Sequence, residues 1–349
     1  MGEQARATIK DVAKAAGVSF QTVSRVLNQR PDVAAQTRRR VLDVIDRLGY
    51  RPSALARSLV QQRSCTLGVV TAGLKYIGGP GRALNGITRR AAELGYTLLL
   101  QELSRFDLIA VEPLVHALLA QQVDGIIWAV PEVGSNHQWL SAPGALPVPF
   151  VFVSTAPRPS LPVVCIDNFA GAQLAVRHLL QQGYRHIGHI SGPEEWWEAQ
   201  QRRLGWQGVL AEAGLPAEAC EEGNWSSASG AQAMRRLLDQ FPHLDAVFAA
   251  NDQMALGALL AVAQGGRKVP QFGVVGFDGL PEAAYYLPPL TTILQDQQAL
   301  GMCAVEEVVR LVEAKRQGLP AEPRCTILQP ALVIRQSTDR TNSLPPLEI

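Results

Sequence analysis

The chain has 349 residues, 47% of them hydrophobic, and a net charge of only +1 at neutral pH. This length and apolar content predict two or three well-packed domains. Residues 1–60 carry eleven Lys and Arg against five Asp and Glu, a net +6, which leaves −5 for the remainder. A basic segment ahead of a mildly acidic body indicates a polyanionic partner for that segment alone, although a solvated helix face gives the same count.

The N-terminus, MGEQARATIKD, lacks the apolar stretch of a secretory signal, and no uncharged apolar run is long enough to span a bilayer. The five cysteines are widely spaced, form no C-x-x-C motif and lie mostly in apolar runs. Buried free thiols in a reducing compartment are therefore expected. We expect a cytoplasmic protein with no membrane partner.

Three short helices are expected near the N-terminus, at 9–16, at 20–28 and from Thr37 to about Leu48, where Gly49 is a plausible stop. Gly17 separates the first two helices, and Ser19 is a good N-cap for the second. A helix, a glycine-containing turn and a second capped helix are typical of a helix-turn-helix. A plain helical hairpin would show the same pattern.

The second of these helices carries side chains suited to reading DNA. Phe20, Gln21 and Arg25 are expected on its outer face, and the four-residue spacing stacks Gln21 and Arg25 on one side. In the major groove Gln pairs with an adenine edge and Arg with a guanine edge. Thr22 and Ser24 suit phosphate contacts.

After residue 63, short β-rich runs alternate with helical ones. Strands are expected at 67–71, 97–100, 125–129, 149–153, 187–190, 246–250 and 273–276, and helices at 84–94, 111–122, 170–182, 201–213, 229–240 and 254–263. This alternation predicts an α/β fold with parallel sheets covered on both faces. The pattern is long enough for two such units, with a crossing near 167–170.

Residues at the expected strand ends indicate a ligand site, because ligands of open parallel sheets bind at the carboxyl ends of the strands. Ser154, Asn251 and Asp278 follow strands, and Arg202 opens a helix. Asp accepts hydrogen bonds from two hydroxyls, while Asn and Arg donate. Trp225 would offer an apolar face to a ring, so the set suits a small-molecule ligand with many hydroxyls.

The N-terminal run resembles the headpiece signature of the lactose-repressor (LacI) family of transcriptional regulators. The matching residues are Asp11-Val12-Ala13, Ala16-Gly17-Val18-Ser19 and Thr22-Val23-Ser24-Arg25-Val26-Leu27-Asn28. The resemblance continues to about residue 338, through GYRHI at 183–187, SGP at 191–193, ANDQMALG at 250–257, VGFD at 275–278 and PPLTTI at 288–293. It implies a sequence-specific DNA-binding repressor whose operator affinity a small molecule controls.

The resemblance also implies a domain layout, an N-terminal helix-turn-helix headpiece plus a two-subdomain, periplasmic-binding-protein-like sensor. Residues 8–50 form the DNA-binding domain, 51–64 the hinge helix and linker, 65–338 the effector-binding domain and 339–349 a short tail. The N-subdomain would cover about 65–166 and 297–324, and the C-subdomain about 167–293 and 325–338. Three crossings are then expected near Ile166, Leu294 and Arg324.

On the DNA side, the resemblance implies a hinge helix over 53–59 that orders on operator DNA. It adds Asn28 to the DNA-contacting residues and makes Leu59 a wedge in the minor groove, although Leu59 can also pack against its own headpiece. Palindromic operators imply a homodimer. A tetramer is not expected, since the polar, proline-containing end at 341–349 has no heptads.

On the ligand side, family matches make Arg202, Asn251 and Asp278 the leading effector contacts. Trp225 and Gln295 lie in stretches most similar to galactoside-responsive members. Three differences from the galactoside-responsive members weaken a galactoside assignment. Ser154 stands where they have an Asp, and Gln297 stands where they have an aromatic residue. The Gly-rich loop at 73–81 replaces an apolar wall of their site, a loss for which Tyr76 partly compensates. A differently linked glycoside, or a purine co-repressor, remains the alternative effector.

Rival functions have weaker support. A secreted sugar-binding protein of a transporter needs a signal peptide and no headpiece. Asp252 and Asp278 imitate a glycosidase pair, but the sequence has no Gly-x-Ser-x-Gly elbow, and no Gly-Lys-Ser/Thr follows Gly78-Gly-Pro-Gly81. His186 and His189 face opposite sides of a strand, a poor metal geometry. We therefore expect no enzyme activity, cofactor or metal.

Overall fold

The computed structural model describes residues 7–27, 30–50, 63–72, 79–103, 111–136 and 147–340. The chain divides into two compact units, a headpiece (Met1–Ser64) and a body (Cys65–Ile349). Four sequence predictions lie outside the described residues: Asn28, the hinge at 53–59 with its Leu59, Tyr76, and the tail at 341–349. Within the described ranges, no helix combines the length and apolar character that a membrane crossing needs.

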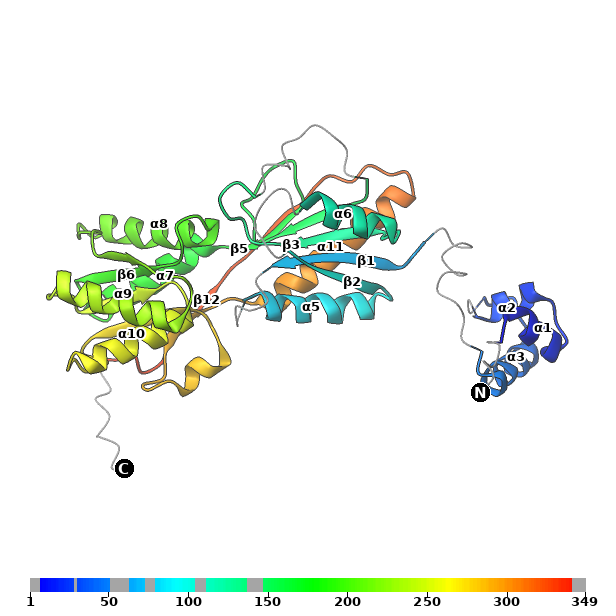
Figure 1. Ribbon diagram of the computed structural model, residues 1–349, viewed down its shortest axis with the longest axis horizontal. Helices are drawn as coiled ribbons and strands as arrows, with labels where there is room; N and C mark the ends of the chain where they lie inside the picture. The colour runs from blue at the N-terminus through cyan, green and yellow to red at the C-terminus, as the bar shows by residue number, and fades with distance from the viewer. Residues whose placement is uncertain are drawn as a thin grey trace, which may run out of the picture. The chain divides into compact units, whose positions relative to one another are not determined.

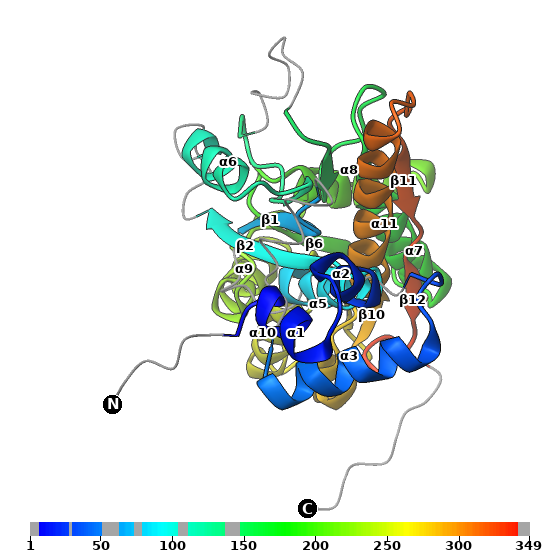
Figure 2. The same ribbon diagram turned by 90° about the vertical axis from the view of Figure 1, so that its right-hand side faces the viewer.

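The headpiece contains the three expected helices, α1 (Ile9–Ala16), α2 (Phe20–Leu27) and α3 (Ala35–Leu48) (Figure 2). Thr8 caps α1 in a capping box, because its hydroxyl accepts from the Asp11 amide and the Asp11 carboxylate accepts from the Thr8 amide. The Thr8 hydroxyl also donates to the Asp11 carboxylate at 2.7 Å, and this bond together with the one from the Thr8 amide lowers the pKa of Asp11. Gly17 ends α1 with φ +62°, a left-handed conformation that favours glycine. The helices enclose a small apolar core of Val12, Ala13, Ala16, Val23, Val26, Val41 and Val44.

The first subdomain of the body is built on a six-stranded parallel sheet in the order β11-β5-β4-β3-β1-β2. Its strands are β1 (Thr66–Ala72), β2 (Thr97–Leu103), β3 (Gly125–Ala129), β4 (Phe150–Val153), β5 (Val163–Ile166) and β11 (Cys325–Leu328). Helices α5 (Gly79–Glu93) and α11 (Gln297–Arg316) cover one face, and α6 (Val111–Ala120) covers the other (Figure 1). The α5–α11 contact is close because a Cβ on Gly301 would lie 2.1 Å from the Ala83 carbonyl oxygen.

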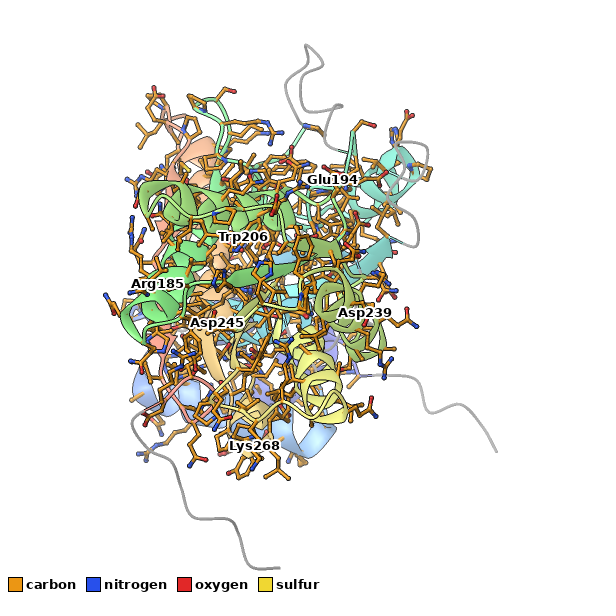
Figure 3. The ribbon with its side chains drawn as sticks, turned by 90° about the vertical axis from the view of Figure 1, so that its left-hand side faces the viewer. Arg185, Glu194, Trp206, Asp239, Asp245 and Lys268 are labelled. Carbon is orange, nitrogen blue, oxygen red and sulfur yellow. The ribbon has the colours of Figure 1, made fainter. Side chains whose placement is uncertain are left out.

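The second subdomain has a six-stranded sheet in the order β12-β10-β9-β8-β6-β7, parallel except for β12. Its strands are β6 (Ile187–Ser191), β7 (Cys220–Glu222), β8 (Ala246–Ala249), β9 (Gly273–Asp278), β10 (Thr291–Leu294) and β12 (Ala331–Val333). Helices α7 (Asn168–Gln181) and α8 (Trp197–Glu212) cover one face, and α9 (Ser227–Gln240) and α10 (Asp252–Gln264) the other. Trp206 of α8 is fully buried and donates through its indole nitrogen to the Ile187 carbonyl at 3.2 Å (Figure 3).

The chain crosses between the two sheets three times, after β5, β10 and β11. The first two crossings lie where the sequence indicates, but the third falls between Leu328 and Ala331 rather than at Arg324. The reason is that β11 pairs in register with β5, Cys325 opposite Val163 and Leu328 opposite Ile166. Residues 325–328 therefore belong to the sheet of the first subdomain, not to that of the second.

The cysteines differ in part from the expectation of buried thiols. Cys165 on β5 is buried, whereas Cys325 on the edge strand β11 is exposed. The other three, Cys65, Cys220 and Cys303, are half-buried, and all five are free. An apolar neighbourhood in the sequence thus did not distinguish a central strand from an edge strand.

Candidate ligand-binding site and nucleic-acid interface

A pocket in the body collects side chains from the carboxyl ends of strands in both sheets. Six of the seven residues predicted for the effector site line it, namely Ser154, Arg202, Trp225, Asn251, Asp278 and Gln295. The seventh, Tyr76, lies outside the described residues. The opposite wall is apolar and comes mainly from the first subdomain, with Val69, Ala72, Ala83, Leu84, Ile87, Ala129, Pro131 and Val153. The pocket therefore pairs a polar side with an apolar one.

Asp278 is the last residue of β9 and lies at the centre of the polar side, with φ +106°. The Gln295 amide nitrogen donates to Asp278 Oδ1 at 2.7 Å, and Arg202 Nη1 lies 3.5 Å from the same oxygen. Burial raises the pKa of Asp278, while the Arg202 charge and the Gln295 bond oppose that shift. No residue in the described ranges donates to Oδ2, which leaves that oxygen able to accept from a ligand.

Arg202 projects from α8 and is held by three separate contacts. Its Nε donates to the Asn168 side-chain oxygen at 2.8 Å, and its Nη1 donates to the Ala250 carbonyl. The guanidinium also lies over the Phe277 ring, 3.9 Å from the ring centroid. These contacts fix the plane of the guanidinium before any ligand arrives, which lowers the entropic cost of using it in binding.

Asn251 and Trp225 join two loops of the second subdomain. The Asn251 side-chain oxygen caps α10 by accepting from the Met254 amide at 2.8 Å, and its nitrogen donates to the Trp225 carbonyl at 3.0 Å. Both ends of the amide are thus engaged by the protein, so Asn251 at least holds Trp225 in place. The Trp225 indole lies against Gly192, where a Cβ would come within 2.1 Å of the ring, and edge-to-face with Trp196 at 5.5 Å.

Sequence reasoning missed two charged residues near this site, Glu198 and Arg82. Glu198 lies on α8 four residues before Arg202 and lines the same pocket; that spacing places both on one helix face and was the available signal. Arg82 on α5 donates through Nη1 to the carbonyls of Asp278 and Gly279, at 3.3 and 3.2 Å. No sequence pattern predicts that contact, because it joins residues nearly two hundred positions apart.

Asp252, the other half of the imagined glycosidase pair, is turned to the protein interior. Its two carboxylate oxygens accept from the Thr292 hydroxyl at 2.6 Å and from the Leu280 amide at 2.7 Å. Burial and the nearby Asp278 charge raise its pKa to about 8. Since its own chain engages both oxygens, Asp252 supports the loop after β9 rather than facing a ligand.

The headpiece presents the predicted DNA-reading side chains on one helix. Phe20, Gln21 and Arg25 are exposed on α2, while Val23 and Val26 on its other side are buried. Arg25 lies 3.4 Å from Asp32, with both side chains more than half exposed, so DNA can replace this weak pairing.

The two residues predicted for phosphate contacts, Thr22 and Ser24, are half-buried on the same helix. The Thr22 amide donates to the Ser19 hydroxyl at 3.1 Å, which is the N-cap expected from the sequence. The capped, anchored helix therefore presents Gln21 and Arg25 in a fixed register.

A helix-turn-helix headpiece followed by a two-subdomain body with a polar pocket defines the class of ligand-responsive DNA-binding regulators. Comparison with known proteins agrees. Residues 8–53 match the family model "Bacterial regulatory proteins, lacI family", and residues 176–338 match "Periplasmic binding protein-like domain".

The lactose operon repressor of Escherichia coli (strain K12) is 34% identical over 309 residues, 88% of this chain and 85% of that protein. The HTH-type transcriptional repressor PurR of Mannheimia succiniciproducens is 34% identical over 340 residues, 96% of this chain and 99% of that protein. A crystal structure of the Lac repressor dimer, bound to operator and the anti-inducer ONPF, superimposes with a TM-score of 0.86 at 34% identity, covering 95% of this chain and 99% of the other. The chain belongs to the LacI family and is a DNA-binding transcriptional repressor.

Proposed function

We propose that this repressor acts in the cytoplasm as a homodimer whose affinity for operator DNA is lowered by a galactoside-like sugar. The observation that carries the proposal is the fixed group of Asp278, Arg202 and Gln295 beside the Trp225 ring. A carboxylate with one uncommitted oxygen suits a pair of sugar hydroxyls, and an indole face suits the C–H groups of a pyranose ring. The similarity to the lactose operon repressor favours a galactoside within this class.

For DNA recognition, we propose that Gln21 and Arg25 read base edges in the major groove and that Thr22 and Ser24 contact phosphates. Their places on the exposed and half-exposed sides of α2 support these roles. Phe20, 57% exposed beside them, supplies an apolar surface for a thymine methyl group. Asn28 and Leu59 remain predictions from the family resemblance.

Exposed apolar side chains on the second subdomain support the homodimer. Leu256 and Leu260, four residues apart on α10, are 39% and 53% exposed, while Tyr285 and Leu287 in and after the 3₁₀ helix η3 (Pro281–Tyr285) are 87% and 82% exposed. Both elements pack their buried sides into the same hydrophobic cluster. Large exposed apolar groups close together mark an interaction surface.

Contacts between the two subdomains across the pocket can couple sugar binding to the release of operator DNA. Arg82 of the first subdomain donates to the carbonyl of Asp278 in the second. At the pocket's rim, Val133 forms a β-bridge with Trp196, and the Gly134 amide donates to the Glu195 carbonyl at 2.8 Å. We propose that a sugar bound at Asp278 favours the arrangement in which these contacts form, and that the subdomain shift separates the paired hinges at 53–59 and releases operator.

A purine acting as co-repressor is the second candidate, favoured by the similarity to PurR over nearly the full chain. A thermal-shift screen of the full-length protein against neutral galactosides and purine bases separates the two, because a ligand that binds the native state raises its melting temperature. We expect a galactoside to stabilise the protein and a purine base to leave it unchanged. Stabilisation by a purine alone would replace the galactoside proposal with the co-repressor.

A further inference from the structure

We propose that Glu198 determines the specificity of the effector site: it accepts hydroxyl groups of a neutral sugar and excludes sugars that carry a phosphate or carboxylate. This inference rests on the proposed function of the pocket and names the effector class more narrowly.

The first support is that Glu198 is a carboxylate with no ion-pair partner among the residues that the structure describes. It lines the pocket together with Arg202 and Asp278, and these three are the titratable side chains that the described part of the chain places in its wall. The Arg202 guanidinium lies 3.5 Å from Asp278 Oδ1, and no cation in the described ranges lies within 4.0 Å of the Glu198 carboxylate. A charged group left unpaired in a pocket is a mark of a binding site.

The second support is the position of Glu198 across the pocket. It lies on α8 of the second subdomain, yet it lines the same pocket as Ser154, which follows β4 in the first subdomain and whose side chain lowers the pKa of Glu198. Ser154 itself has φ +57°, a left-handed backbone conformation directly after the strand. A sugar hydroxyl that meets Glu198 therefore binds where the two subdomains face each other.

The third support is the charge balance of the pocket. Two carboxylates face one guanidinium, and that guanidinium is already occupied by Asp278, the Ala250 carbonyl and Asn168. Burial and the Asp278 charge raise the pKa of the half-buried Glu198, whereas the Arg202 charge and Ser154 lower it. A neutral polyol supplies hydroxyl donors, whereas a phosphate or carboxylate brings further negative charge to a wall whose one described cation, Arg202, is already paired; Arg82, outside that wall, donates to the Asp278 and Gly279 carbonyls.

Isothermal titration of the full-length protein with methyl β-galactoside and with its 6-phosphate tests this inference. Wild type should bind the neutral sugar at least about tenfold more tightly, the effect of one unfavourable charge contact. Glu198→Gln should bind the neutral sugar about tenfold or more weakly, because it replaces a charge-assisted acceptor with a neutral one. Its preference for the neutral sugar over the phosphate should shrink severalfold.

Two further variants serve as controls for Glu198→Gln. Glu212→Gln changes the same residue type on the same helix at a site that is 61% exposed and paired with Arg177, and it should behave as wild type. Glu198→Asp keeps the charge and should retain the discrimination against phosphate even where its affinity falls. Melting temperature and operator affinity without sugar, measured for each variant, show that the fold is intact.

The outcomes are distinct. Wild-type affinity and wild-type discrimination in Glu198→Gln would overturn the role of Glu198 and leave the galactoside function standing. Equal binding of both sugars by wild type would overturn the exclusion of anions. If wild type bound neither sugar but bound a purine base, the proposed function itself would be wrong, and the inference with it.

Discussion

Replacing Asp278 with Asn removes one charge from the buried polar side of the pocket while keeping the side-chain shape. The amide oxygen can still accept from Gln295, which now donates to Oδ1 at 2.7 Å. The amide nitrogen takes the place of the second oxygen, so a sugar hydroxyl there would meet a donor instead of an acceptor. One charge-assisted hydrogen bond is worth about 1.5–3 kcal/mol. Galactoside affinity should therefore fall by roughly 10- to 150-fold.

The substitution also has a cost in stability. Arg202, whose side chain is 5% exposed, loses its anionic neighbour but keeps the Ala250 carbonyl and Asn168 as acceptors. We expect a loss of about 1–3 kcal/mol in the free energy of unfolding, the cost of a buried polar group left incompletely paired. At roughly 2–4 °C per kcal/mol, the melting temperature should fall by several degrees without unfolding the protein at room temperature.

The assay is calorimetric titration of galactoside into Asp278→Asn, beside a matched Asp239→Asn control. Asp239 is exposed on α9, at the surface of the second subdomain (Figure 3). Operator affinity without sugar should be the same in both variants and in wild type, since the headpiece is unchanged. Wild-type galactoside affinity and wild-type operator release in Asp278→Asn would refute our placement of the sugar at this carboxylate.

Three further predictions concern the recognition of operator bases, the oligomeric state, and the role of Trp225 in the pocket. Gln21→Ala and Arg25→Ala should each lose about 1–3 kcal/mol of operator discrimination while salt-sensitive nonspecific binding survives; unchanged specificity in a competition assay would remove α2 from the major groove. Light scattering should give a dimer without DNA, and a stable four-chain mass would contradict the assembly that we propose. Gly192→Ala places a Cβ 2.1 Å from the Trp225 ring, so it should displace the indole and weaken galactoside binding at least about tenfold; normal affinity together with unaltered tryptophan fluorescence would show that the ring is not part of the site.

Local patterns in the sequence were enough to predict the headpiece. Its helices are short and have clear start and stop signals, with Ser19 as a cap and Gly17 and Gly49 in left-handed conformations. The strand-end argument also works for the body, because the carboxyl ends of parallel strands share one edge wherever the sheet forms. Ser154, Asn251 and Asp278 line one pocket for that reason.

Long-range pairing was harder to predict. The strands β5, β7, β10, β11 and β12 have three or four residues each, too few to show a period of their own. They are strands because neighbours in the sheet complete their hydrogen bonds, as β5 does for β11. The misplaced crossing at Arg324 has the same cause.

The roles of individual site residues depended on contacts that only the folded chain creates. Both the oxygen and the nitrogen of the Asn251 side chain form hydrogen bonds within the protein, which its residue type did not reveal. Glu198 gains significance from Ser154 across the pocket, and Arg82 from two backbone carbonyls on the loop after β9.

A galactoside bound in the body is proposed to weaken operator binding by the headpiece. The direct measurement is operator affinity of the wild-type dimer by fluorescence anisotropy at fixed salt, with and without saturating galactoside. We predict that the sugar lowers operator affinity by a factor of about 5–150, and that operator lowers galactoside affinity by the same factor, as linkage requires. Operator affinity that stays the same or rises on adding the sugar would contradict induction by a galactoside.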